Sequence, residues 1–159
     1  RSRILRKEET LMGKNFNGTQ INNSATIVEK AGAAITDCRN KILKYDENGD
    51  VVLATSGKDI PIGVALIEAG CNDITGAESG KVSVGDDVDI LVKDIGFVLA
   101  GAAITKGQEI AAGANGLAAV ATDGDYVLGV ALSSVKANEY CRVQIARYQK
   151  AAAAAGGEG

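Results

Sequence analysis

The sequence offers few side chains from which a catalytic site could be built. None of its 159 residues is a histidine. Serine–histidine and cysteine–histidine nucleophile systems, histidine-ligated zinc and the two-histidine iron site therefore cannot form within the chain. Catalysis would have to use carboxylates, lysine, tyrosine or cysteine. The three cysteines, Cys38, Cys71 and Cys141, form no C-x-x-C pair, and we interpret them as free, mostly buried thiols.

Three short segments resemble known ligand sites, and each departs from the pattern that the chemistry needs. The glycine-rich segment 76–82 has three residues between its glycines where a phosphate loop has four, and Val82 replaces the required Ser or Thr. The oxygen-rich segment 46–50 has its glycine in the wrong place for a calcium loop. The aspartates within 86–89 have no basic partner nearby in sequence. We interpret all three as turns or solvated surface, and we predict no cofactor and no metal ion.

The strongest pattern in the chain is an internal duplication. Three segments recur in the same order: Ala31–Thr36 as Ala100–Thr105, Asn48-Gly49 as Asn115-Gly116, and Gly63–Leu66 as Gly129–Leu132. Two copies are too few for a solenoid, which generally needs three or more repeats. The duplication favours a pseudo-symmetric pair of sheets or a barrel.

Short apolar runs bounded by Gly, Asn and Asp fill the middle of the chain and are typical of β-strands. The Asn-Gly dipeptides supply the positive φ angles that tight hairpin turns need. We predict eleven strands: Ala25–Glu29, Lys41–Tyr45, Val51–Ala54, Pro61–Ile67, Lys81–Val84, Val88–Val92, Gly96–Leu99, Glu109–Ala112, Leu117–Val120, Tyr126–Leu132 and Tyr140–Ala146. The expected fold class is all-β, a small antiparallel barrel or sandwich with an internal two-fold repeat and an extended N-terminal arm.

The two ends differ from the middle in composition. Residues 1–24 are polar and aperiodic and predict an N-terminal arm, while residues 149–159 predict a flexible Ala/Gly tail. Between them, residues 25–148 are expected to form one β-rich domain, with repeats at about 31–66 and 100–132. No apolar run approaches the ~20 residues that span a bilayer, so we expect no membrane partner.

Charge is segregated along the chain. Residues 1–14 carry a net charge of +3, residues 46–94 carry -8, and residues 136–150 carry +3. The two basic ends are suited to docking on acidic surfaces, and the alternative is an ordinary solvated surface. No basic stripe with interleaved aromatic residues is present, so we expect no nucleic-acid partner.

The order of these motifs resembles the small capsid cement, or decoration, proteins of tailed bacteriophages. Gly63–Leu66 and Gly129–Leu132 each follow an Asn-Gly turn and a short apolar strand. Lys106–Glu109 precedes the second of them, and Tyr140–Ile145 closes the pattern. The resemblance covers roughly residues 25–147.

This resemblance implies a β-rich module that assembles, commonly as a homotrimer, on the outside of an icosahedral shell and bridges neighbouring major capsid proteins. It would be a non-enzymatic protein of the virion's capsid surface, assembled in the host cytoplasm, with the major capsid protein and its own copies as partners. We assign capsid contact to six residues of the arm: Arg1, Arg3, Arg6, Lys7, Lys14 and Phe16. Two alternatives stay open, namely another phage β assembly module of the tail or baseplate, and a small trimeric β-fold enzyme.

Overall fold

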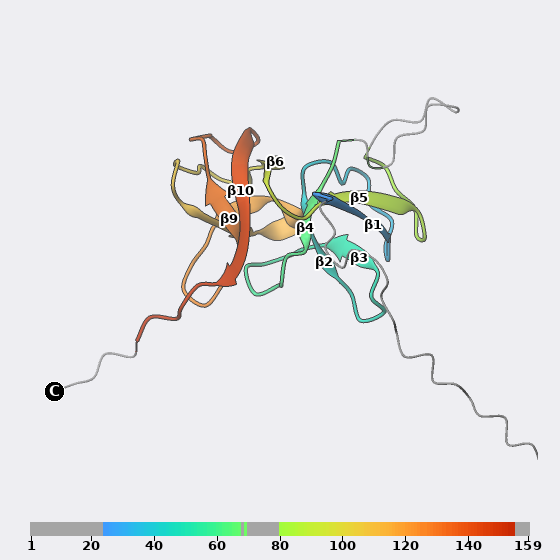
Figure 1. The fold of residues 1–159 in the computed structure, drawn as a ribbon, viewed down its shortest axis with the longest axis horizontal. Coiled ribbons are helices and arrows are strands. Elements are labelled where there is room, and N and C mark those ends of the chain that lie inside the picture. Colours follow the sequence, from blue (N-terminus) through green and yellow to red (C-terminus); the bar gives the residue numbers. More distant parts are fainter. Residues whose placement is uncertain (1–23, 68, 70–79, 155–159) are drawn as a thin grey trace, which may run out of the picture.

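A computed structural model describes residues 24–67, 69 and 80–154, and in these ranges the chain is all-β. Its strands form two five-stranded sheets, and within each sheet all neighbouring strands pair antiparallel. The strands are β1 (Thr26–Lys30), β2 (Ile42–Tyr45), β3 (Val51–Leu53), β4 (Gly63–Ala65), β5 (Asp87–Leu91), β6 (Ile95–Leu99), β7 (Glu109–Ala112), β8 (Ala118–Val120), β9 (Tyr126–Ala131) and β10 (Tyr140–Gln149). The two sheets lie side by side in Figure 1, and β4 of the first sheet and β6 of the second lie where the sheets meet. The prediction of an all-β fold is confirmed, and the two packed sheets are sandwich-like.

Ten of the eleven predicted strands are present within a few residues of their expected bounds. The prediction of a strand over Lys81–Val84 is wrong, because only Val82 pairs, in an isolated bridge with Ile35. Gly80 and Gly85 flank this segment with φ angles of 96° and 85°, and these left-handed conformations turn the chain away on both sides. The last strand, β10, is longer than expected and continues to Gln149.

The two sheets have the same strand order. The first sheet is ordered β1-β5-β4-β2-β3, and the second is ordered β6-β10-β9-β7-β8. Isolated bridges also recur at equivalent positions, with Ala31 to Val51 and Ala100 to Ala118 both parallel. The duplication in the sequence is therefore a duplication of the fold. We call β1–β5 the first repeat and β6–β10 the second repeat.

The glycine of the recurring Gly-Val-Ala-Leu segment has the same role in both repeats. A Cβ on Gly63 would lie 2.1 Å from the carbonyl oxygen of Leu91, and a Cβ on Gly129 would lie 2.0 Å from that of Gln144. Leu91 and Gln144 occupy equivalent places in the neighbouring strands β5 and β10. Only glycine permits these two strand pairs to approach so closely.

The first repeat buries side chains on both faces of its sheet. Leu43 belongs to a core made only of first-repeat residues, whereas its neighbour Ile42 belongs to a larger core shared with the second repeat. Val64 and Leu91 also enter this shared core, and all three lie on what we call the outer face of the first repeat. The second repeat therefore covers the part of the outer face that contains these three residues, which accounts for the continuous apolar character of β4.

The Asn-Gly turn of the second repeat docks on the first repeat. Asn115 and Gly116 have φ angles of 55° and 70°. The Gly116 N–H donates to the carbonyl oxygen of Ala54 at 2.7 Å, and a Cβ on Gly116 would lie 2.8 Å from the carbonyl oxygen of Ile42. This turn thus has a docking role that its counterpart at Asn48-Gly49 lacks.

Candidate interaction surface

The outward faces of the two equivalent edge strands, β1 and β6, differ in chemistry. Both strands lie at the edge of their sheet beside the longest partner of their repeat, β5 or β10. At equivalent outward positions, β1 presents Thr26, Val28 and Lys30, and β6 presents Ile95, Phe97 and Leu99. The second repeat is therefore the more apolar at this edge.

The same contrast continues on the partner strands. In the first repeat, the exposed ammonium of Lys30 pairs with the carboxylate of Asp87 across β1 and β5. In the second repeat, Leu99 lies opposite Tyr140 in the same register. The first repeat thus has an exposed charged pair at this position, and the second repeat has half-buried Leu99 beside exposed Tyr140. An apolar choice at an exposed site, where the same fold accepts charge, is typical of a binding surface.

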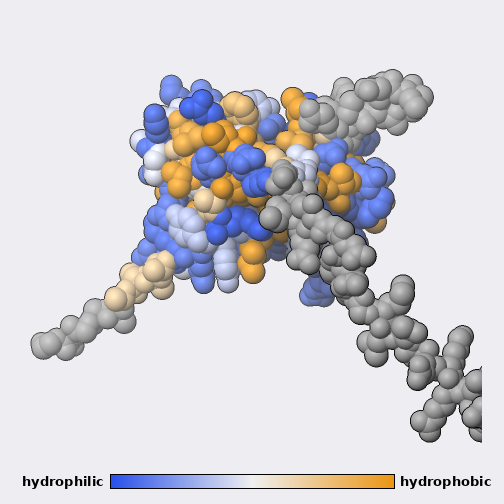
Figure 2. All heavy atoms as spheres, viewed as in Figure 1, coloured by the Kyte–Doolittle hydropathy of each residue, from blue (hydrophilic) through white to orange (hydrophobic). Residues whose placement is uncertain are grey.

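A groove of about 550 Å³ runs along this edge between the two repeats. Its lining is mostly apolar, and the Asn40 amide and the Tyr140 hydroxyl are its polar side-chain groups: Asn40, Val64, Ala65, Leu66, Ile67, Leu91, Ile95, Gly96, Phe97 and Tyr140. Four of these side chains remain more than half exposed, namely Ile67, Ile95, Phe97 and Tyr140. Figure 2 shows hydrophobic residues reaching the surface over both repeats, between hydrophilic margins. We call these ten residues the inter-repeat groove.

The groove is positioned by contacts between the repeats. Asn40, with φ of 56°, donates from its side-chain Nδ2 to the carbonyl oxygen of Phe97 at 3.1 Å, and its own carbonyl accepts from the Leu99 N–H at 2.8 Å. These two bonds cover part of the free edge of β6. At the other end of β6, Gly96 has no side chain, and the Leu91 side chain occupies the space that a Cβ would need. These contacts therefore fix the two walls of the groove, one from each repeat, relative to each other.

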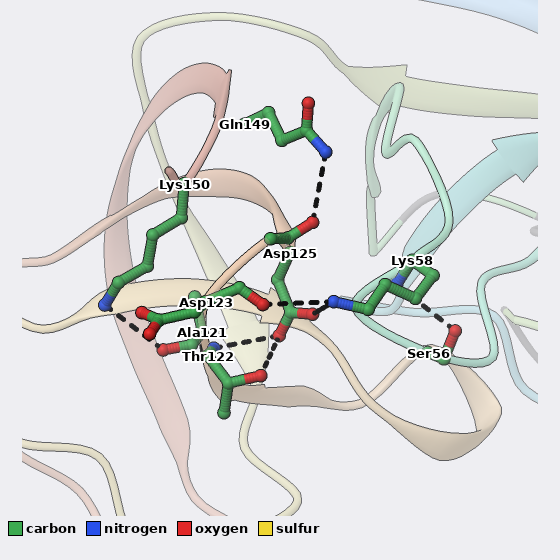
Figure 3. A network of polar contacts seen from close by, with 9 residues as sticks. Ser56, Lys58, Ala121, Thr122, Asp123, Asp125, Gln149 and Lys150 are labelled. Atoms are coloured by element: carbon green, nitrogen blue, oxygen red, sulfur yellow. Dashed lines mark hydrogen bonds and ion pairs between the residues drawn. The ribbon is translucent and has the colours of Figure 1, made fainter. Parts of the chain in front are cut away.

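A polar network on another part of the molecule also fixes the repeats to each other (Figure 3). The Lys58 ammonium of the first repeat lies 2.8 Å from Asp125 Oδ1 of the second and 3.2 Å from the Asp123 carbonyl oxygen. Asp125 is nearly buried, and its Oδ2 accepts from the N–H and hydroxyl of Thr122. Hydrogen bonds from Lys58 and Thr122 hold the pKa of the Asp125 carboxyl below its ordinary value.

The equivalent carboxylate of the first repeat, Asp59, uses the same local geometry with a different lysine. Its Oδ2 accepts from the N–H and hydroxyl of Thr55, and Lys44 pairs with its Oδ1 at 2.7 Å. Burial opposes ionisation here, but the bonds from Lys44 and Thr55 prevail and lower the pKa of Asp59 to about 2. The motif is thus internal to the first repeat at Asp59 and joins the two repeats at Asp125.

The arm residues to which we assigned capsid contact lie outside the described residues: Arg1, Arg3, Arg6, Lys7, Lys14 and Phe16. Cys71 also lies outside them, whereas Cys38 and Cys141 are buried free thiols. Burial raises the pKa of the Cys38 thiol. Over the described ranges, no group of three or more Cys, Asp and Glu side chains is placed to hold a metal ion, and no helix is long and apolar enough to cross a membrane.

Two features of this surface were missed by reasoning from the sequence. The aspartates within 86–89 do have a basic partner, Lys30, but it lies 57 residues away and meets Asp87 only through strand pairing. The inter-repeat groove was also missed. Aligning the repeats at the offset of Ala31 to Ala100 would have indicated the more apolar edge strand beside it, because Thr26 and Lys30 then align with Ile95 and Leu99.

Comparisons with known proteins give a likeness in fold to a phage protein. No protein-family model matches the sequence, and no curated protein matches it. Among solved structures, the fold is similar to that of the head fiber gp8.5 N base in bacteriophage phi29, with a TM-score of 0.56 and 21% sequence identity. The match covers 78% of this chain and 95% of that chain. At this identity the likeness establishes that the two chains share a fold.

Proposed function

We propose that this chain is a structural protein of a phage virion that decorates the capsid. The single observation that carries the proposal is the shared fold with a base domain of a phage head fiber, which spans nearly the whole of that chain. The order of motifs along residues 25–147, which resembles phage cement proteins, supports the same assignment. In this role the protein binds the outside of the major capsid protein shell and stabilises it by bridging neighbouring subunits, as a homotrimer.

The two-repeat architecture is suited to such a role. A bridging protein has to transmit force between its contact surfaces without deforming. The shared core around Ile42, Val64 and Leu91 and the Lys58–Asp125 pair join the repeats at separate places. Such a body can resist outward pressure on a shell.

The N-terminal arm provides the capsid contact in this proposal. Residues 1–14 carry five basic and two acidic side chains, which favours an acidic capsid surface. Three arms on one trimer bind with a high effective concentration, so weak individual contacts give strong attachment. The protein acts at the capsid surface after assembly in the host cytoplasm, by binding rather than catalysis, and without nucleic acid or membrane.

Binding to empty shells tests the proposal directly. The purified protein is mixed with empty shells of the phage that encodes it, sedimented, and imaged by negative stain, and its mass in solution is measured by sedimentation equilibrium. We expect the mass of the free protein to correspond to three chains. In the images we expect added density on the outer surface of the shell. Complete virions are imaged in the same way, and density on their tails or baseplates instead of the shell would replace the capsid role by another phage assembly role. Turnover of a nucleotide, found by following up hits of a thermal-shift screen with nucleotides and divalent metals, would support the enzyme alternative.

A further inference from the structure

We propose that residues 17–23 of this chain dock into the inter-repeat groove of the same molecule, with the side chain of Ile21 packed against the apolar walls formed by Leu91, Ile95 and Phe97. The inference is independent of the capsid role, because it concerns how one chain covers its own exposed apolar surface.

The first observation is the place where the described chain begins. The Val92 N–H donates to the carbonyl oxygen of Ala25 at 2.9 Å, and Thr26 pairs with Leu91 in the antiparallel register of β1 and β5. Ala25 also packs against the shared core that contains Leu91. The chain therefore enters β1 beside Val92, which follows the last residue of β5 and lies three residues before Ile95, the first residue of β6 and part of the groove lining.

The second observation is reach. Ile21 precedes Ala25 by four residues, which corresponds to about 13 Å of extended chain. Leu91 forms one wall of the groove and is itself paired with Thr26. The distance to be covered is thus short, and the tether keeps the local concentration of the segment high, so a weak contact is sufficient for occupancy.

The third observation is chemical fit. No residue that lines the groove is charged. Residues 17–23 read Asn-Gly-Thr-Gln-Ile-Asn-Asn, which is an uncharged segment with one large apolar side chain. The preceding residues 1–14 carry seven charges and do not fit an apolar groove. Among the segments before β1, residues 17–23 are therefore the best suited to fill it.

The groove is also continuous with an interface that the molecule already uses. Val64 and Leu91 line the groove and at the same time belong to the core between the repeats. An added apolar side chain at this place extends that core outward. Docking of residues 17–23 would also fix the root of the arm, leaving residues 1–16 with a reach of about 50 Å from a defined point.

Thiol labelling of the full chain tests this inference without capsids. Phe97→Cys places a reporter in the groove, and Val28→Cys places one at the equivalent position of the first repeat, outside the groove and similarly exposed. Cys71→Ser removes the competing thiol in all variants, and Cys38 and Cys141 are buried. Labelling rates are compared with and without Ile21→Asp, which removes the apolar contact.

We expect Ile21→Asp to raise the labelling rate at Phe97→Cys by about tenfold, since a docked segment leaves the groove open in a minor population. The rate at Val28→Cys should not change. Equal rates at Phe97→Cys with and without Ile21→Asp would overturn the inference. A labelling rate at Phe97→Cys that falls as protein concentration rises would show that a segment of another copy, or another occupant, fills the groove, and would overturn the same-molecule assignment. If Phe97→Cys lowers the melting temperature, Ile95→Cys serves as the second groove reporter.

Discussion

Lys58 and Asp125 are 67 residues apart in the chain, and their side chains form an ion pair of 2.8 Å that joins the two repeats. The carboxylate is nearly buried while the lysine is mostly exposed. The same carboxylate motif in the first repeat pairs with a lysine of its own sheet. One local motif, used twice, therefore stabilises a single repeat in one place and the contact between repeats in the other.

Removing this lysine should weaken the molecule measurably. Lys58→Ala leaves the buried Asp125 carboxylate without its cation, and we expect the unfolding free energy to fall by about 1–2 kcal/mol. This is the lower part of the cost of leaving a buried hydrogen-bond acceptor unpaired, because the lysine is largely exposed to solvent. Urea unfolding followed by circular dichroism measures this. Lys136→Ala removes an exposed lysine as the matched control, and an equal loss in both variants would contradict the role of the pair.

Acid should destabilise the protein through the two motif carboxylates. The folded-state pKa of Asp59 is about 2, against an ordinary 3.8, and that of Asp125 is also lowered. The unfolded chain therefore binds more protons than the folded chain in this range, so stability is complete above about pH 5 and is lost as pH falls toward 2. Melting temperature measured from pH 6 to pH 2 should fall steeply, and less steeply in Asp59→Asn. Glu47→Gln, in an exposed turn, should keep the wild-type slope, and a wild-type slope in Asp59→Asn would refute the assignment.

The glycines of the recurring Gly-Val-Ala-Leu segment should tolerate no side chain. In Gly63→Ala and Gly129→Ala the new Cβ meets a backbone oxygen of the adjacent strand, which cannot move aside as a side chain could. We expect each substitution to cost about 2–3 kcal/mol of unfolding free energy. Gly113→Ala is the control, since its nearest neighbours lie at ordinary contact distance of 3.4 Å. Chemical unfolding of the three variants checks the prediction, which fails if all three behave alike.

Exchanging the chemistry of the two edges should change association more than stability. Leu99→Lys with Tyr140→Asp gives the second repeat the exposed charged pair that the first repeat has in Lys30 and Asp87. Because Tyr140 is exposed and Leu99 is only half-buried, we expect a smaller change in the unfolding midpoint than a core substitution would cause. The reverse exchange, Lys30→Leu with Asp87→Tyr, creates a new apolar edge and should cause self-association, seen by size-exclusion chromatography. A monodisperse reverse variant with an unchanged elution volume would argue against an interaction role for the apolar pair.

Loss of the basic arm should separate folding from capsid binding. A variant lacking residues 1–16 keeps the ten strands of the described residues, so we expect its melting temperature to be unchanged. Its attachment to empty shells should weaken at least tenfold because three arms are lost from each trimer at once. High salt should weaken attachment of the full chain to the shell in the same way, because the Debye length falls to ~3 Å at 1 M and the charges of the arm are screened. Attachment of the truncated chain, which lacks these charges, should depend less on salt. Equal co-sedimentation of both forms at low salt would remove the arm from the mechanism.

Local patterns predicted the strands well and the contacts between repeats poorly. Alternation in Val88 and Ile90 located β5, and the recurrence of Gly63–Leu66 anticipated two sheets of the same strand order. By contrast, Val82 looks like part of a strand but lies between two left-handed glycines, and only one bridge forms there. The end of β10 depends on distant contacts, because Gln149 and the following residue Lys150 are held by hydrogen bonds to the β8–β9 turn (Figure 3).

The inter-repeat groove was not predictable from local pattern alone. Ile95 and Phe97 alternate with Gly96 and Val98 in the manner of any half-buried strand. The pattern shows that one face is buried but not that the other face is apolar and open. That distinction depends on where the second sheet packs against the first, which is set by contacts such as Asn40 to Leu99 across distant parts of the chain.

The unequal burial of the two repeats makes the halves of this molecule unlike as separate fragments. Where the first repeat has Ile42 on its outer face, the second has Glu109 at the equivalent place. Cut at the β5–β6 turn, the first half would expose Ile42, Val64 and Leu91 to water, and the second half would lose these side chains from the core that they share with Val98, Ile110 and Val143. The duplicated fold is therefore completed only when both halves are present, and during synthesis the first half exposes its apolar outer face until the second half has been made.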